Sequence, residues 1–147
     1  MIRRFDPRDD RGSILPLVCF YGALALLVTL LVAAATSLYL ERKRLFTLAD
    51  GAALVGAESF ELTAVTMTSG GPRATLTDAG VRDAVAGYLA SNPIGRFEAL
   101  HLDEASTPDG RSAEVTVSAV WRPPVVTLFL PEGLRVEATA VSRTVFW

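Results

Sequence analysis

Charged residues are unevenly distributed along the chain, and the longest gap between them lies near the N-terminus. Residues 12–40 contain no Asp, Glu, Lys, Arg or His. As an α-helix, residues 14–40 would be about 40 Å long at about 1.5 Å per residue, compared with about 30 Å for a hydrocarbon core. Tyr21 and Tyr39 lie toward the two ends, where aromatic rings favour the headgroup region. The pattern therefore predicts a transmembrane helix over residues 13–40.

The helix is not expected to end where the charges resume. Residues 41–62 contain no proline and are rich in Ala, Leu, Glu and Arg, which favour helix. Small side chains recur here on one helical face: Ala49, Ala52, Ala53, Gly56 and Ala57. Such a face allows close approach of a helix or sheet, either the chain's own or that of another subunit. We predict that residues 41–62 continue the helix outside the membrane and that the small-residue face is a packing or assembly surface.

Asp50 interrupts this alanine-rich part of the helix. Its carboxylate would suit an amine or guanidinium from a neighbouring subunit, or the chain's own Arg42 and Lys43. The alternative is a solvated side chain, which is the usual state of a helix carboxylate. Both interpretations stay open from the sequence.

Residues 63–147 are predicted to form a small α/β head domain. Thr77 is a suitable N-cap for a second helix with Val81 and Val85 on its apolar face. Residues 113–122 and 134–143 alternate apolar and polar, as half-buried strands do. The inward residues would be Val115, Val117, Ala119, Trp121, Leu134, Val136, Ala138 and Ala140. The expected fold class is α+β, with the long helix and the second helix packed on a small antiparallel sheet.

Several connecting segments have weaker patterns. Residues 64–68 suggest a short extended piece, followed by a loop at 69–72 and a strong turn at 107–110. The apolar stretches 125–129 and 145–147 are candidates for contact with a partner, although inward packing against the sheet is the preferred interpretation.

The composition of the chain excludes several classes of site. The chain has 147 residues and a formal net charge of −2, and it contains one histidine and one cysteine. Zinc clusters and disulfide scaffolds are therefore excluded. From Leu45 onward there are 7 basic and 12 acidic residues, so no positive field would attract a nucleic acid.

Candidate catalytic groups are few and are not grouped by any motif. The chain contains no Gly-x-Ser-x-Gly elbow that would supply a nucleophilic serine to His101. Asp103 and Glu104 are neighbours in a strand, so they should point to opposite faces and could not act on one substrate. The glycines before Arg73 lack the Lys-Ser or Lys-Thr of a phosphate loop. We predict no catalytic residue, no metal, no cofactor and no small-molecule substrate.

Orientation depends on the charges next to the membrane segment. Four arginines precede it, whereas three basic residues at 42–44 follow it, and the next basic residue is Arg73. We predict a cytoplasmic tail at residues 1–12 and an extracytoplasmic C-terminal domain on a single-pass protein of the cell (inner) membrane. A cleaved secretory signal ending at Ala33-Ala34-Ala35 is an alternative, although its apolar region would be unusually long.

The N-terminal third of the chain resembles a known family. Arg11-Gly12-Ser13, the long apolar helix, Tyr39-Leu40-x-Arg42-x-Arg44-Leu45, Ala49-Asp50, Ala52-Ala53-Leu54 and Ala57 are similar to the start of TadE/TadG-like proteins. These proteins belong to tight-adherence (Flp) pilus assembly systems. The resemblance covers residues 11–57, with Phe46 where the family often has Gln, and Leu48, Gly51 and Val55 where it often has Ala.

The resemblance implies a pilin-like fold and a structural role in a Flp (Tad) pilus or related secretion system, in the manner of a minor pilin. It also implies partners: the lipid bilayer and other pilus or secretion-system membrane proteins, contacted by helix packing. Relatives are cut after a glycine, and Gly12-Ser13 fits that position, although Leu17 stands where glutamate is preferred. The alternatives are a membrane-tethered extracytoplasmic binding module and a secreted soluble protein.

Overall fold

The computed structural model describes most of the chain: residues 14–60, 65–68, 71–73, 75–91, 97–123, 126–128 and 130–143. The predicted tail at 1–12, the Gly12-Ser13 position and the apolar C-terminus at 145–147 lie outside the described residues.

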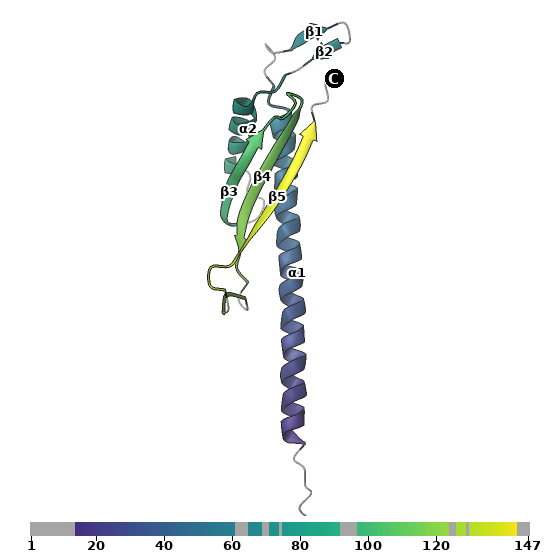
Figure 1. The fold of residues 1–147 in the computed structure, drawn as a ribbon, viewed down its shortest axis with the longest axis vertical. Coiled ribbons are helices and arrows are strands. Elements are labelled where there is room, and N and C mark those ends of the chain that lie inside the picture. The colour runs from purple at the N-terminus through teal and green to yellow at the C-terminus, as the bar shows by residue number, and fades with distance from the viewer. Residues whose placement is uncertain are drawn as a thin grey trace, which may run out of the picture.

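Helix α1, Leu15–Ala57, is the longest element and runs along the long axis of the molecule, from its lower part up into the head (Figure 1). Its 43 residues extend over about 65 Å at about 1.5 Å per residue. The helix ends at Ala57, before the predicted end near Leu62, which is outside the described residues. Ser59 accounts for this end, because its N–H and its hydroxyl both donate to the carbonyl of Gly56, at 3.2 and 2.7 Å.

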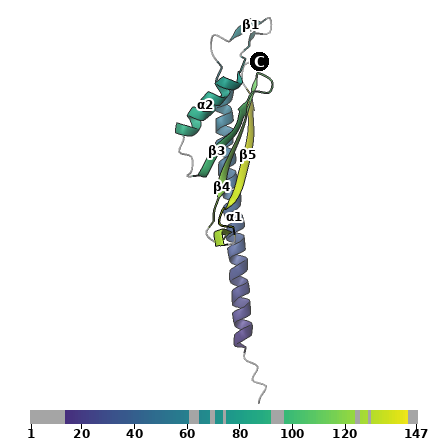
Figure 2. The same cartoon turned by 60° about the vertical axis from the view of Figure 1, so that its left-hand side comes forward.

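A three-stranded antiparallel sheet lies against the upper part of α1, the part nearer its C-terminal end (Figures 1 and 2). Its strands are β3, Glu98–Ser106, β4, Ser112–Trp121, and β5, Leu134–Arg143, in the order β3-β4-β5. Both strongly alternating segments of the sequence are therefore strands. A separate hairpin of β1, Thr66–Thr68, and β2, Gly71–Arg73, occupies the upper tip. The residues of β2 that were predicted as part of a loop thus pair with β1.

One face of the sheet packs on the helices and forms the core. The predicted inward residues Val115, Val117, Ala119, Trp121, Val136, Ala138 and Ala140 are all buried, whereas Leu134 is 40 % exposed at the lower end of β5. Helix α2, Asp78–Ser91, adds Val81 and Val85 to the core and contacts both α1 and β3. The α+β class is thereby confirmed, with the second helix and the antiparallel sheet both packed against the long helix.

Helices α1 and α2 and strand β4 meet at Gly56. A Cβ atom there would lie 3.1 Å from Cβ of Ala113 and 3.1 Å from Cγ1 of Val81. Those are tighter distances than side-chain carbons normally tolerate. The small-residue face is therefore what allows α1, α2 and β4 to meet.

Turn residues shape the connection between β3 and β4 and the entry into β5. At the predicted 107–110 turn, Asp109 accepts from the backbone N–H groups of Arg111 and Ser112 at 2.9 and 2.6 Å. These bonds lower the pKa of the Asp109 carboxyl. Gly110 follows with φ +68°, a conformation that glycine adopts without strain. In the apolar 125–130 segment, a 3-10 turn forms at Val126–Leu128, and Gly133, with φ +75°, leads into β5.

Candidate functional site

The small-residue face of α1 points inward. Ala49, Ala52 and Ala53 are fully buried, Ala57 is 1 % exposed, and Gly56 is buried with them. Their neighbours are the sheet and α2 of the same chain. Of the two packing partners that the sequence left open, the chain's own elements occupy this face, so it is not a free surface for another subunit.

The opposite side of α1 is open and carries an apolar row with an acid in its middle. Phe46 and Leu54 are each 51 % exposed, and Asp50 lies exposed between them. The spacing of four residues places these three side chains along one ridge of the helix. We call Phe46, Asp50 and Leu54 the outer ridge. Asp50 was predicted from the sequence as a candidate contact residue, whereas Phe46 and Leu54 were not, although both lie four residues from it.

Positive charge lies just below the outer ridge. Phe46 lines an open hollow of about 220 Å³ together with Tyr39, Arg42 and Lys43. The surface thus carries a negative charge at Asp50 and positive charges at Arg42 and Lys43 beside its exposed apolar side chains. A partner would need complementary charges in the same order along the helix.

The lower part of α1 is uncovered. Its most apolar 18-residue window has a mean hydropathy of 2.5, and none of that window is buried in the molecule. Within the described part of the chain, α1 is the one helix that is long and apolar enough to cross a membrane. This apolar helix near the N-terminus is compatible with a membrane anchor.

The head meets α1 within the charge-free stretch. The indole N–H of Trp121 donates to the hydroxyl oxygen of Ser37 at 3.2 Å, and Ala34 and Leu38 pack against the core. Beside this contact, a groove of about 600 Å³ runs between α1 and β5. Thus the upper end of the predicted span over residues 13–40 already lies alongside the head.

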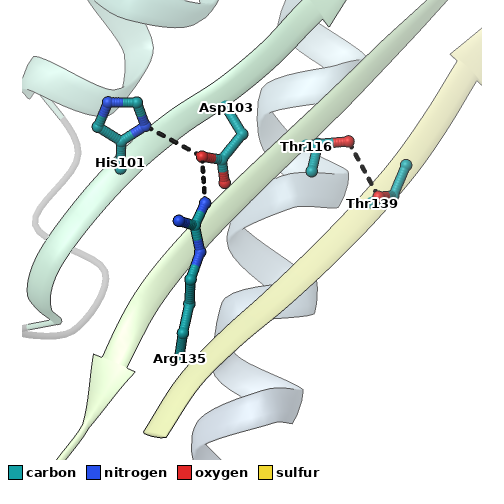
Figure 3. A network of polar contacts seen from close by, with 5 residues as sticks. All are labelled: His101, Asp103, Thr116, Arg135 and Thr139. Carbon is teal, nitrogen blue, oxygen red and sulfur yellow. Dashed lines mark hydrogen bonds and ion pairs between the residues drawn. The ribbon is translucent and has the colours of Figure 1, made fainter. Parts of the chain in front are cut away.

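Polar side chains cover the face of the sheet that points away from α1 (Figure 3). The carboxylate of Asp103 accepts hydrogen bonds from the guanidinium of Arg135 at 2.5 Å and from Nδ1 of His101 at 3.1 Å. Thr116 and Thr139 join β4 to β5 through their hydroxyls at 2.9 Å. The Ser118 hydroxyl holds the pKa of Asp103 below its usual value, with further lowering from Arg135 and His101.

The structure brings His101, Asp103 and Ser118 together, three residue types that can form a nucleophilic triad. In a working triad the imidazole takes a proton from the serine. Here the hydroxyl of Ser118 and the imidazole of His101 both donate hydrogen bonds to the carboxylate of Asp103. Ser118 is also only 3 % exposed. This arrangement links the three strands and does not present an activated nucleophile.

The expectation that Asp103 and Glu104 point to opposite faces is wrong. The pairing of β3 with β4 shifts between Leu102 and Glu104, as at a β-bulge. Leu102 and Ala105 pack toward the core, so Asp103 and Glu104 both fall on the outer face. The extra residue is what brings the carboxylate of Asp103 to Arg135.

A metal centre finds no support in the described residues, which contain no group of three or more His, Cys, Asp or Glu side chains able to hold an ion. The single cysteine, Cys19, is exposed on the lower part of α1.

Comparison with known proteins identifies one region of the chain. Residues 12–59 match the model of the Tad family, described as Flp pilus-assembly TadE/G-like. No curated protein and no solved structure matches the chain significantly. The matched region comprises the apolar half of α1, the outer ridge and the small-residue face.

Proposed function

We propose that the chain is a single-pass membrane protein with a structural role in a Flp (Tad) type pilus or related secretion system, because residues 12–59 match the Tad family of Flp pilus-assembly TadE/G-like sequences. Its role is that of a minor pilin or assembly partner, exercised by helix packing without turnover. The family is one of structural rather than enzymatic proteins, in keeping with this role.

The outer ridge is the observation that carries this proposal. Since the small-residue face is filled by the chain's own sheet, a neighbouring subunit must contact α1 on its other side. There Phe46 and Leu54 offer exposed apolar area, and Asp50 offers a charge that specifies the partner. The ridge lies above the apolar part of the same helix, so one partner helix can follow both.

The proposed location is the inner membrane, with the N-terminus in the cytoplasm and the head outside. The span is supported by the uncovered apolar part of α1, and the orientation by the arginines of the N-terminal tail. In this arrangement the outer ridge faces other extracytoplasmic helices close to the membrane.

Site-specific photo-crosslinking in cells that assemble the pilus tests the proposal. A photoreactive residue is placed at Phe46 or Leu54 in the full chain, and at Met67, which is 85 % exposed on the distant hairpin, as the control. We expect adducts with pilus membrane proteins from the two ridge positions and not from Met67.

Two results would contradict the assembly role. Equal adducts from Met67 and from the ridge would show contact without a specific surface. Adducts that form only from Met67 on the head, and with a soluble partner, would favour a membrane-tethered binding module.

A further inference from the structure

The end of the head nearest the lower part of α1 has a partly apolar surface among its described residues. We call it the lower rim and define it by Arg122, Val126, Leu130 and Leu134. Leu130 and Leu134 are 47 and 40 % exposed. Figures 1 and 2 show the described residues between β4 and β5 at the lower end of the sheet, on the side of the uncovered part of α1.

Backbone hydrogen bonds hold the lower rim in place. The N–H of Leu130 donates to the carbonyl of Val126 at 2.8 Å, and the N–H of Gly133 donates to the carbonyl of Leu130 at 3.0 Å. The side chain of Arg122 donates to the carbonyl of Glu132 at 3.3 Å. These bonds tie Leu130 to Val126 and to the residues that lead into β5.

The height of the lower rim along α1 follows from the contact of Trp121 with Ser37. We place Ile14, the first described residue of the apolar stretch, at the inner boundary of the hydrocarbon core, so that residues 14–33 span its thickness of about 30 Å at about 1.5 Å per residue. Ser37 lies about 6 Å beyond Ala33 by the same rise. Since the headgroup region adds roughly 5 to 7 Å on each side, Ser37 and the lower rim fall at headgroup level.

Charges limit how deep this end of the head can lie. Arg122 and Glu98 form an exposed ion pair at 3.6 Å, and Arg135 is exposed on β5. These groups would be costly inside hydrocarbon, whereas apolar side chains next to arginines are typical of surfaces that lie in the membrane interface. The mixture places the lower rim on the bilayer surface and not within it.

We propose that the lower rim rests on the lipid surface, with Leu130 and Leu134 at the boundary between headgroups and acyl chains. The head is then held against the membrane instead of standing on a free stalk of helix. This inference rests on the proposed function only in requiring that α1 spans the membrane. The lipid surface is favoured over a second protein copy because Leu134 of the lower rim lines one groove with Ala35 and Leu38 of α1, at the upper end of the charge-free stretch.

Spin labelling of the full chain in liposomes of phosphatidylcholine and phosphatidylglycerol tests the contact. The chain has a single cysteine, so Cys19→Ser gives a cysteine-free background. Nitroxide labels are then placed through Leu130→Cys, Met67→Cys or Leu26→Cys, all at exposed positions. Collision rates with oxygen, which concentrates in lipid, and with a water-soluble nickel chelate report depth. We expect the oxygen-to-nickel ratio at Leu130 to exceed that at Met67 several-fold and to be lower than at Leu26.

The outcomes separate this inference from the anchor itself. If Leu26 is in lipid while Leu130 and Met67 have equal ratios, the head stands clear of the membrane and the inference is overturned alone. If the Leu26 label is also in water, the membrane anchor fails with it. Dipolar broadening at Leu130 that disappears on dilution with unlabelled protein would assign the lower rim to a second copy and overturn the lipid contact.

Discussion

Ser37 is a polar residue within the charge-free stretch, and its hydroxyl joins α1 to the sheet through Trp121. The bond is partly buried, so its loss would leave the indole N–H without its protein partner. The contact lies at the lower end of the sheet, beside the packing of Ala34 and Leu38 against the core.

We predict that Ser37→Ala lowers the free energy of unfolding by about 0.5 to 1.5 kcal/mol, the usual net contribution of such a bond. Thr36→Ala is the control, because the Thr36 hydroxyl bonds only to the carbonyl of Val32 one turn earlier on the exposed side of α1. Chemical denaturation of the purified protein in detergent, followed by tryptophan fluorescence, measures both. Equal losses in the two variants would mean that the contact to Trp121 contributes nothing.

Asp103 makes the stability of the sheet depend on pH. Its pKa is lowered in the folded protein, mainly by the Ser118 hydroxyl and then by Arg135. A lowered folded-state pKa means that the stabilisation is present above the unfolded pKa of about 3.9 and is lost as pH falls through the folded value.

Asp103→Asn is therefore expected to lower Tm at pH 7 and to have little effect below the folded-state pKa of Asp103. Thermal unfolding followed by circular dichroism at a series of pH values measures the difference. Asp83→Asn, at an exposed position on α2, is the matched control. A Tm difference between Asp103→Asn and the unchanged protein that stays constant from pH 7 to pH 3 would show that ionisation of Asp103 is not the cause.

At the scale of the element, α1 is one continuous helix with two parts. The lower part is apolar and uncovered, and the upper part has the small-residue face. The apolar part could be predicted from the sequence because the absence of charge is a local property. The small-residue face could be found by its spacing, but its partner could not, since packing depends on contacts with β4, β5 and α2 that are distant in the sequence.

Overfilling the small-residue face should destabilise the protein. Ala53 is fully buried, so Ala53→Leu forces neighbouring side chains to move and is expected to cost about 1 to 3 kcal/mol. Thr47→Leu adds a similar apolar side chain on the exposed side of α1 and should change the free energy of unfolding little. Chemical denaturation of both variants checks the difference. If Ala53→Leu were as stable as Thr47→Leu, the face would not be close-packed.

The apolar part of α1 should fail as an anchor when charged. Arginine near the centre of a membrane span costs about 2.5 to 3.5 kcal/mol per residue on insertion scales. We expect the double variant Leu24→Arg, Leu27→Arg to leave the carbonate-resistant membrane fraction, measured by immunoblotting after alkaline extraction. Met67→Arg with Val141→Arg adds the same charge at exposed head positions and should stay in the membrane. Retention of both double variants would argue against insertion of α1.

At the scale of the whole molecule, the head packs on α1 further down than the charges indicate. The sequence predicts a membrane helix that extends to Leu40 and a head that begins at residue 63. The structure packs Ala34, Ser37 and Leu38 beside the sheet, so the lower boundary of the contact between head and helix lies near Ala34. A uniform apolar segment gives no sign of which of its residues will face lipid and which will face protein.

Two truncated chains test this boundary. A chain beginning at Ala34 keeps the lower packing residues, whereas one beginning at Glu41 loses Ala34, Ser37 and Leu38. We expect the shorter chain to be less stable by about 2 kcal/mol, from the lost burial of Leu38 and the lost bond to Trp121. Thermal and chemical unfolding of the two soluble proteins gives the comparison. Equal stability would return the boundary to Leu40.

The sequence by itself determined the features that depend on neighbouring residues: the apolar helix, the spacing of its small side chains, the alternating strands and the turn at Asp109. Only the tertiary structure decided what covers the small-residue face, that Phe46 and Leu54 are left outside with Asp50, and that a bulge carries Asp103 to Arg135. The physical reason is that burial and strand register are set by contacts between residues far apart in the chain. The same reason explains why the head packs on the last turns of the apolar stretch, at Ala34, Ser37 and Leu38, which the sequence alone assigned to the membrane helix.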